Sequence, residues 1–151
     1  MSDRREYPER PVVGVGGVVI SGRRALLVRR AKPPLEGEWS IPGGMLETGE
    51  TIVEGVRREL AEETGIEVRV NGLIEVFERI SLDEAGKHKY HYVVLDYFCE
   101  ALQGDARPGS DAKEIAWVSE EELGEYPLAA SARRVVQRAF EMAREAARPP
   151  G

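Results

Sequence analysis

The sequence has few of the features expected of a secreted, membrane-spanning or DNA-binding protein. Cys99 is the single cysteine among 151 residues, which excludes an internal disulfide and leads us to expect a cytoplasmic location. No apolar run approaches the roughly 18 residues of a membrane span, and residues 1–10 lack the apolar core of a secretory signal. A formal net charge of -6 argues against a binder of long nucleic acids, which usually carries a basic face. A small phosphorylated ligand is still compatible with this charge, because bound cations can reverse the local sign.

The composition and the order of elements predict one globular domain. Apolar residues make up 42% of the chain and charged residues 32%, as in ordinary globular proteins. We predict strands over residues 12–20, 25–30, 67–70, 73–80, 89–101 and 115–118, with a turn at 71–72. Helices are predicted over 51–64, shortly after 119, and over 128–147; residues 1–10 should be a flexible lead-in and 148–151 a frayed tail. This mixture lacks a regular βαβ rhythm, which favours an α/β or α+β sandwich around a mixed sheet.

The helix predicted over residues 51–64 has clear start and stop signals. Thr51 and Glu54 have the spacing of a capping box, and Gly65 follows as the C-terminal stop. Apolar residues at helical spacing should form its buried stripe: Val53, Val56 and Leu60.

The same helix gathers carboxylates on one face. At about 100° per residue, Glu63 lies about 40° to one side of Glu59 and Glu62 about 60° to the other. Like charges so close repel, which is easier to understand if the face holds a cation. Gly55 lies on this face too, and its missing side chain leaves space for a loop, a metal or a phosphate. The alternative is a solvated acidic surface.

An ion pair beside this face should hold the loop before the helix in place. Arg58 can pair with Glu50 across the turn that precedes the helix, which would fix that loop. The carboxylates of Glu59, Glu62 and Glu63 are hard oxygen ligands. Such ligands suit Mg²⁺ or Mn²⁺ and not zinc, which prefers nitrogen and sulfur.

The spacing of these residues resembles the signature of the Nudix hydrolases, which spans residues 44–66 and is called the box below. The matching positions are Gly44, Glu50, Arg58, Glu59, Leu60, Glu62, Glu63, Gly65 and Ile66. The preceding residues 39–43 are also similar to that family's usual approach, and the Trp117 strand and two helices extend the resemblance to nearly the whole chain. The resemblance implies an α/β/α sandwich around a mixed sheet. It also implies Mg²⁺- or Mn²⁺-dependent hydrolysis of a nucleoside diphosphate linked to a further group.

The resemblance also implies roles for individual residues. Glu59, Glu62 and Glu63 would bind the metal, with Glu59 and Glu63 as the principal pair and the carbonyl oxygen of Gly43 or Gly44 as a further ligand. Glu50 and Arg58 would support the site. The catalytic base varies within the family, and a box glutamate or Glu114 in the later loop could serve; Asp111 competes for that role, and a solvated loop charge is the alternative for Glu114.

Residues outside the box should bind the substrate. Arg29, Arg30 and Lys32 could meet the phosphates, although strand alternation sends Arg29 and Arg30 to opposite sides. Aromatic residues could stack on a base or belong to the core: Trp39, Phe77, Tyr90 and Tyr92. No subfamily marker is matched. The stretch 111–117 resembles compact bacterial ADP-ribose or nucleoside triphosphate hydrolases, and we favour an ADP-ribose-type substrate, with (d)NTPs as the first alternative. A non-catalytic nucleotide-binding module is the second alternative and an acidic structural domain the third. A homodimer is also expected.

Overall fold

The computed structural model describes residues 5–31, 36–109 and 112–148. Its strands are β1 (Val12–Ser21), β2 (Arg24–Arg30), β3 (Trp39–Ser40), β4 (Gly43–Met45), β5 (Glu67–Leu82), β6 (His88–Gln103) and β7 (Ala112–Ser119). Its helices are α1 (Ile52–Thr64), the 3₁₀ helix η1 (Glu121–Glu125) and α2 (Ala130–Ala147). The described residues include no helix that is both long and apolar enough to cross a membrane.

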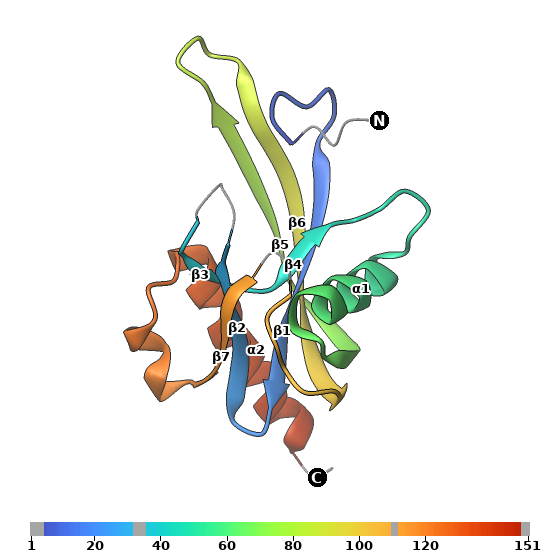
Figure 1. Ribbon diagram of the computed structural model, residues 1–151, viewed down its shortest axis with the longest axis vertical. Coiled ribbons are helices and arrows are strands. Elements are labelled where there is room, and N and C mark those ends of the chain that lie inside the picture. Colours follow the sequence, from blue (N-terminus) through green and yellow to red (C-terminus); the bar gives the residue numbers. More distant parts are fainter. Residues whose placement is uncertain (1–4, 32–35, 110–111, 149–151) are drawn as a thin grey trace.

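The strands form one mixed sheet of seven strands in the order β3-β2-β1-β6-β5, with β4 paired to β1 and β7 to β2. β1 and β6 run parallel and the other pairs run antiparallel. Figure 1 shows α1 and α2 on different sides of this sheet. The mixed sheet and the helix on each side confirm the predicted sandwich.

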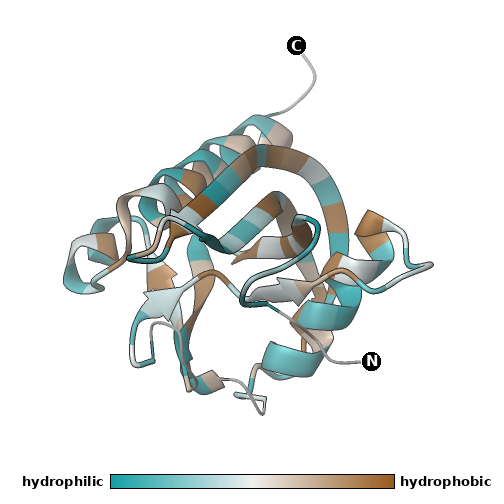
Figure 2. Cartoon of the chain, turned by 90° about the horizontal axis from the view of Figure 1, so that it is seen from above, coloured by the Kyte–Doolittle hydropathy of each residue, from teal (hydrophilic) through white to brown (hydrophobic). Residues whose placement is uncertain are grey.

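Alternation along the strands divides the core into two layers. Bands of hydrophilic and hydrophobic residues alternate along the long strands in Figure 2. The layer under α1 contains Val15, Val19, Leu26, Val56, Leu60, Ile66, Val68 and Cys99. The layer under α2 contains Val18, Ile20, Ala25, Leu27, Phe98, Val118, Leu123, Val135, Val136, Ala139 and Phe140. Neighbouring residues of β1 and β2 therefore contribute to opposite layers, as expected for a sheet covered on both faces.

Helix α1 begins and ends where its capping residues predict. The Thr51 side chain accepts from the backbone of Glu54, and the Glu54 side chain accepts from the backbone of Thr51. Gly65 takes the left-handed conformation at φ 74°. The predicted stripe was wrong in one member, because Val53 is 47% exposed. The buried face instead consists of Gly55, Val56, Leu60 and Thr64.

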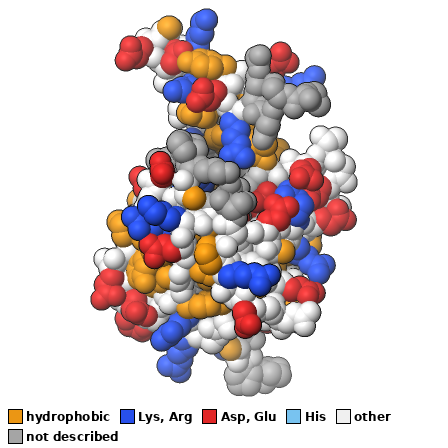
Figure 3. All heavy atoms as spheres, viewed as in Figure 1, with side chains coloured by type: hydrophobic (Ala, Val, Ile, Leu, Met, Phe, Trp, Pro, Cys, Tyr) orange, Lys and Arg blue, Asp and Glu red, His pale blue; other side chains and the backbone are white. Residues whose placement is uncertain are grey.

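The predicted turn at residues 71–72 was also wrong. β5 continues through this position and absorbs it as a register shift between Val70 and Gly72 against β6. A β-bulge accommodates the extra residue without ending the strand. The reversal comes later, where Asp83 accepts hydrogen bonds from the backbone of Ala85 and Lys87. The result is a long hairpin whose outer part, residues 75–96, projects from the body and is called the arm below (Figures 1 and 3).

The start of the described chain lies beside the arm. The Tyr7 amide donates to the carbonyl oxygen of Lys89 at 2.7 Å, and the Tyr7 hydroxyl donates to Asp83 at 2.9 Å. Tyr90 donates to Glu6 at 3.1 Å. Residues 5–10 of the predicted lead-in thus contact the arm, while residues 1–4 and most of the predicted frayed tail lie outside the described residues.

The C-terminal part follows the prediction closely. Ser119 and Glu122 exchange the two hydrogen bonds of the predicted capping box, although the short helix after them is 3₁₀. α2 begins at Ala130, two residues later than predicted. Val135, Val136 and Phe140 are buried as expected.

Candidate active site

Two glutamates of α1 lie against Gly43 and Gly44 of β4, the strand that precedes the helix in sequence. The backbone amide of Gly43 donates to Oε2 of Glu63 at 3.2 Å. A Cβ placed on Gly44 would collide with the carboxyl group of Glu59. Gly44 is therefore needed so that this carboxyl can approach the backbone of β4. The structure brings together the two glutamates and the two glycines that the motif assigns to a metal.

Arg58 ties the loop before α1 to the helix. Its Nε donates to Oε2 of Glu50 at 2.6 Å and its Nη2 donates to Oε1 of Glu50 at 2.9 Å, a two-point contact typical of strong ion pairs. Nη2 also donates to the carbonyl oxygen of Met45 at 2.9 Å. The hydrogen bonds from Arg58, followed by that from the Glu47 amide, lower the pKa of Glu50 to about 2. The predicted pairing of Arg58 with Glu50 is confirmed, and Glu50 is thereby kept charged.

The same guanidinium also reaches the carboxylate face of α1. Nη1 of Arg58 donates to Glu59 at 2.9 Å and lies 3.3 Å from the half-exposed carboxylate of Glu62. Within the described part of the chain, no group of three or more acidic, histidine or cysteine side chains is already arranged to hold a metal. The donor chemistry nevertheless suits Mg²⁺ or Mn²⁺, because Glu59 and Glu63 provide carboxylate oxygens beside the backbone of Gly43 and Gly44.

The space beside Gly55 is filled by the preceding loop. A Cβ on Gly55 would lie 2.6 Å from Leu46 and 3.1 Å from Glu50. Of the three occupants considered for this gap, the loop is the one found there. Because Gly55 has no side chain, the loop can approach the helix closely enough for Glu50 to pair with Arg58; this pair is called the clasp below.

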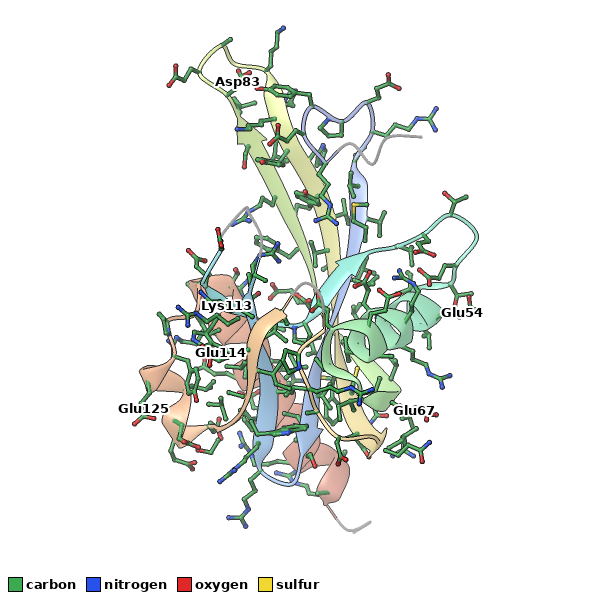
Figure 4. The ribbon with its side chains drawn as sticks, in the orientation of Figure 1. Glu54, Glu67, Asp83, Lys113, Glu114 and Glu125 are labelled. Atoms are coloured by element: carbon green, nitrogen blue, oxygen red, sulfur yellow. The ribbon has the colours of Figure 1, made fainter. Side chains whose placement is uncertain are left out.

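The basic residues of β2 separate as strand alternation predicts. Arg29 donates to Glu114 at 2.7 Å across the β2–β7 pair and to the carbonyl oxygen of Gly37 at 2.9 Å. Figure 4 shows Glu114 on the β7 side of the molecule, apart from α1. Arg30 instead lines a cavity that also reaches Gly43 and Gly44. The remaining candidates, Lys32 and Asp111, lie outside the described residues.

This cavity has a volume of about 260 Å³ and lies on the α2 side of the sheet. The arm forms one wall with three facing pairs of side chains, Glu75–Asp96, Phe77–Val94 and Arg79–Tyr92. Trp39 and the first turn of α2 form the opposite wall. Three of the four aromatic residues considered for stacking, Trp39, Phe77 and Tyr92, therefore line the cavity. Tyr90 is not part of its lining; its ring stacks on Tyr92 with centroids 6.0 Å apart.

Sequence reasoning did not identify Asp96, a carboxyl group in the cavity wall. Burial raises its pKa to about 6, and the nearby charge of Glu75 raises it further in the same direction. A Cβ on Gly16 would lie 2.6 Å from Oδ1 of Asp96, so Gly16 leaves the space that this carboxyl occupies. A signal existed: Asp96 is the single charged residue in the otherwise apolar and aromatic run 92–99.

Known proteins are similar to this chain in sequence and in fold. The family model described as the NUDIX domain matches residues 10–139. An ADP-ribose pyrophosphatase of Methanocaldococcus jannaschii is 35% identical over 104 residues, covering 69% of this chain and 59% of that protein. A MutT-like protein of Streptomyces ambofaciens is 35% identical over 128 residues, covering 83% and 76%. The crystal structure of a MutT NUDIX hydrolase from Burkholderia pseudomallei superposes with a TM-score of 0.74 at 29% identity, covering 86% of this chain and 98% of that one.

Proposed function

The chain belongs to the NUDIX family, and from this we propose that it is a metal-dependent pyrophosphohydrolase of small nucleoside diphosphate derivatives. One observation carries the proposal: Gly43 and Gly44 of β4, against which Glu59 and Glu63 lie, also line the cavity. The carboxylates of α1 are not among the lining residues, so the phosphates of a substrate in the cavity would meet them by extending past Gly43 and Gly44.

We assign Glu59, Glu63 and the carbonyl oxygen of Gly43 or Gly44 to a Mg²⁺ or Mn²⁺ ion, with Glu62 as a further ligand. When bound, such an ion neutralises phosphate charge and lowers the pKa of a coordinated water. Arg58 donates hydrogen bonds to Glu50 of the loop and to Glu59 of the helix, and so fixes these two carboxylates relative to each other.

Residues outside the helix complete the assignment. Arg30 reaches the cavity and is the described basic residue of β2 that could meet the phosphates. A box glutamate is one candidate for the base. Glu114 is the other, and its carboxylate accepts a hydrogen bond from Arg29 at 2.7 Å.

For the substrate we favour an ADP-ribose-type nucleotide. The archaeal relative named an ADP-ribose pyrophosphatase supports this choice at 35% identity, although this chain matches only 59% of its length. A nucleoside triphosphate is the second candidate. The nucleoside triphosphatase NudI of Escherichia coli supports it at 26% identity over 106 residues.

A substrate panel with product identification tests the proposal. Purified protein is incubated with Mg²⁺ and ADP-ribose, nucleotide sugars, NTPs or dNTPs, and the products are separated by chromatography. Release of a nucleoside monophosphate is expected, and Glu63→Gln should lower the rate by orders of magnitude. The matched control is Glu67→Gln, because Glu67 lies beyond the end of α1 (Figure 4) and contacts Gln103 and Arg57. Nucleotide binding without turnover by folded protein would instead identify a non-catalytic module.

A further inference from the structure

The carboxyl group of Asp96 lies close to the start of β4, where Gly43 and Gly44 are. In the sheet, Gly16 of β1 is paired on one side with Asp96 of β6 and on the other with Gly43 of β4. A Cβ on Gly16 would lie 2.6 Å from Oδ1 of Asp96 and 3.3 Å from the carbonyl oxygen of Pro42. The carboxyl group therefore extends over the bare backbone of Gly16, toward Pro42 and the start of β4.

No described residue donates a hydrogen bond to Asp96. The neighbouring carboxylate of Glu75 is committed to Arg134, whose Nε and Nη2 donate to it at 2.9 and 2.6 Å. Arg134 therefore neutralises Glu75 and not Asp96. Asp96 is partly buried and lines the cavity, and its carboxyl oxygens are not among any buried and unsatisfied atoms of the described residues, so they are open to the cavity. A ligand in the cavity can therefore supply the donors that the protein does not.

The position of Asp96 along the cavity indicates which part of a ligand it meets. Adjacent strands are about 4.8 Å apart. Because the Asp96 carboxyl reaches from β6 across β1, it lies within about one strand spacing of Gly43 on β4. In a nucleoside diphosphate derivative the group attached directly to the phosphates is a sugar, whereas the base is farther away. The arm becomes apolar at the next pair, Phe77 and Val94, and cationic at Arg79. Measured from Gly43 and Gly44, the carboxyl group of Asp96 is therefore about as far away as the sugar of such a ligand. The apolar pair of Phe77 and Val94 is about as far away as the planar base.

We propose that Asp96 accepts hydrogen bonds from the hydroxyl groups of the ribose next to the pyrophosphate, and so selects ribose-containing substrates over their 2-deoxy counterparts. This inference rests on the proposed function, because that function places the phosphates at residues 43–44. The chemistry is favourable because vicinal hydroxyls are donors, and an ionised carboxylate only accepts. Acidic residues fulfil the same task for the ribose 2′-hydroxyl in dinucleotide-binding folds.

Binding measurements with matched ligands test the inference without requiring turnover. The ligand pairs are AMP with 2′-deoxy-AMP, and ribose 5-phosphate with 2-deoxyribose 5-phosphate, titrated calorimetrically into the full chain. At least one ribose ligand should bind about tenfold to a hundredfold more tightly than its deoxy partner, the range for a hydrogen bond to a charged group. Asp96→Asn should bring that ratio close to one.

Two further variants sharpen the result. Glu78→Gln is the matched control, since Glu78 lies between Phe77 and Arg79 on the exposed face of the arm and should leave the ratio unchanged. Gly16→Ala should lower the ratio with Asp96 still present, because the added methyl group displaces the carboxyl. A melting curve for each variant establishes that it is folded.

The outcomes separate this inference from the proposed function. An unchanged ratio in folded Asp96→Asn overturns the inference. GMP is titrated in the same way, and a change confined to the preference between AMP and GMP also overturns the inference, because it would assign Asp96 to the base. A ratio that depends on Asp96 in protein that hydrolyses no nucleotide supports the inference while the proposed function fails. Glu63→Gln, which should be inactive, should keep the ratio of the unaltered protein.

Discussion

Replacing Asp96 with asparagine should make the folded protein more stable at pH 8 and change its stability little at pH 4. The pKa of Asp96 is raised from 3.8 to about 6, chiefly by burial and further by Glu75. The folded state therefore binds the proton more tightly than the unfolded chain does. Between these two pKa values, stability falls as the pH rises, because the folded state must then hold a charged carboxylate.

The size of this effect follows from the gap between the two pKa values. Each pH unit of difference corresponds to about 1.4 kcal/mol, so the charged carboxylate destabilises the fold by on the order of 3 kcal/mol at pH 8. Asparagine has nearly the same shape and no charge. Asp96→Asn should thus raise the free energy of unfolding by up to about 3 kcal/mol at pH 8, and by less than about 1 kcal/mol near pH 4.

Urea unfolding of both proteins between pH 4 and pH 8, followed by circular dichroism, measures this difference. Other titrating groups affect both proteins alike, so the difference between the two curves isolates Asp96. A gain that grows with pH agrees with the reasoning. A variant that is less stable than the parent at pH 8, or a difference that does not vary with pH, would refute it.

Three other predictions address α1 and the proposed metal site. Val56→Ala should lower the free energy of unfolding by about 2 kcal/mol because Val56 is fully buried, whereas Val53→Ala should change it by less than about 0.5 kcal/mol; similar losses in urea unfolding would contradict the assigned helix face. Arg58→Lys should lower the melting temperature by several degrees and kcat/KM with it, because lysine cannot make the two-point contact with Glu50; unchanged values in calorimetry and kinetics would show that the clasp is dispensable. Mg²⁺ at a hundred times its Kd should stabilise the protein by about 2.7 kcal/mol; this gain should shrink in Glu63→Gln, and an equal gain in both proteins would place the ion elsewhere.

Local signals in the sequence were sufficient for much of the fold. The capping box at Thr51 and the stop at Gly65 determine the ends of α1, because each acts through hydrogen bonds or backbone conformation within a few residues. The Asn71-Gly72 pair was misleading since a turn signal competes with strand pairing, and the long ladder with β6 prevailed through a bulge. Val53 failed as a core residue because helical spacing does not show which side of a wide stripe meets the sheet.

The candidate site likewise has a part that local sequence signals could predict and a part that they could not. Glu59, Glu63 and Arg58 are close in sequence, so their spacing was enough to place them together. Asp96 and Gly16 became neighbours only through the parallel pairing of β1 with β6, which no local pattern encodes. A cytoplasmic location and a homodimer stay predictions.

The alternating side chains of the arm have a consequence for how this enzyme could acquire new substrates. The six residues of the three facing pairs all point into the cavity, and none of them belongs to α1 or to its capping residues. A library that varies these positions leaves the box intact and retains the buried residues that hold α1 against the sheet. Under the proposed function, substrate preference and bond cleavage depend on separate stretches of sequence, so directed evolution of the first should leave the second intact.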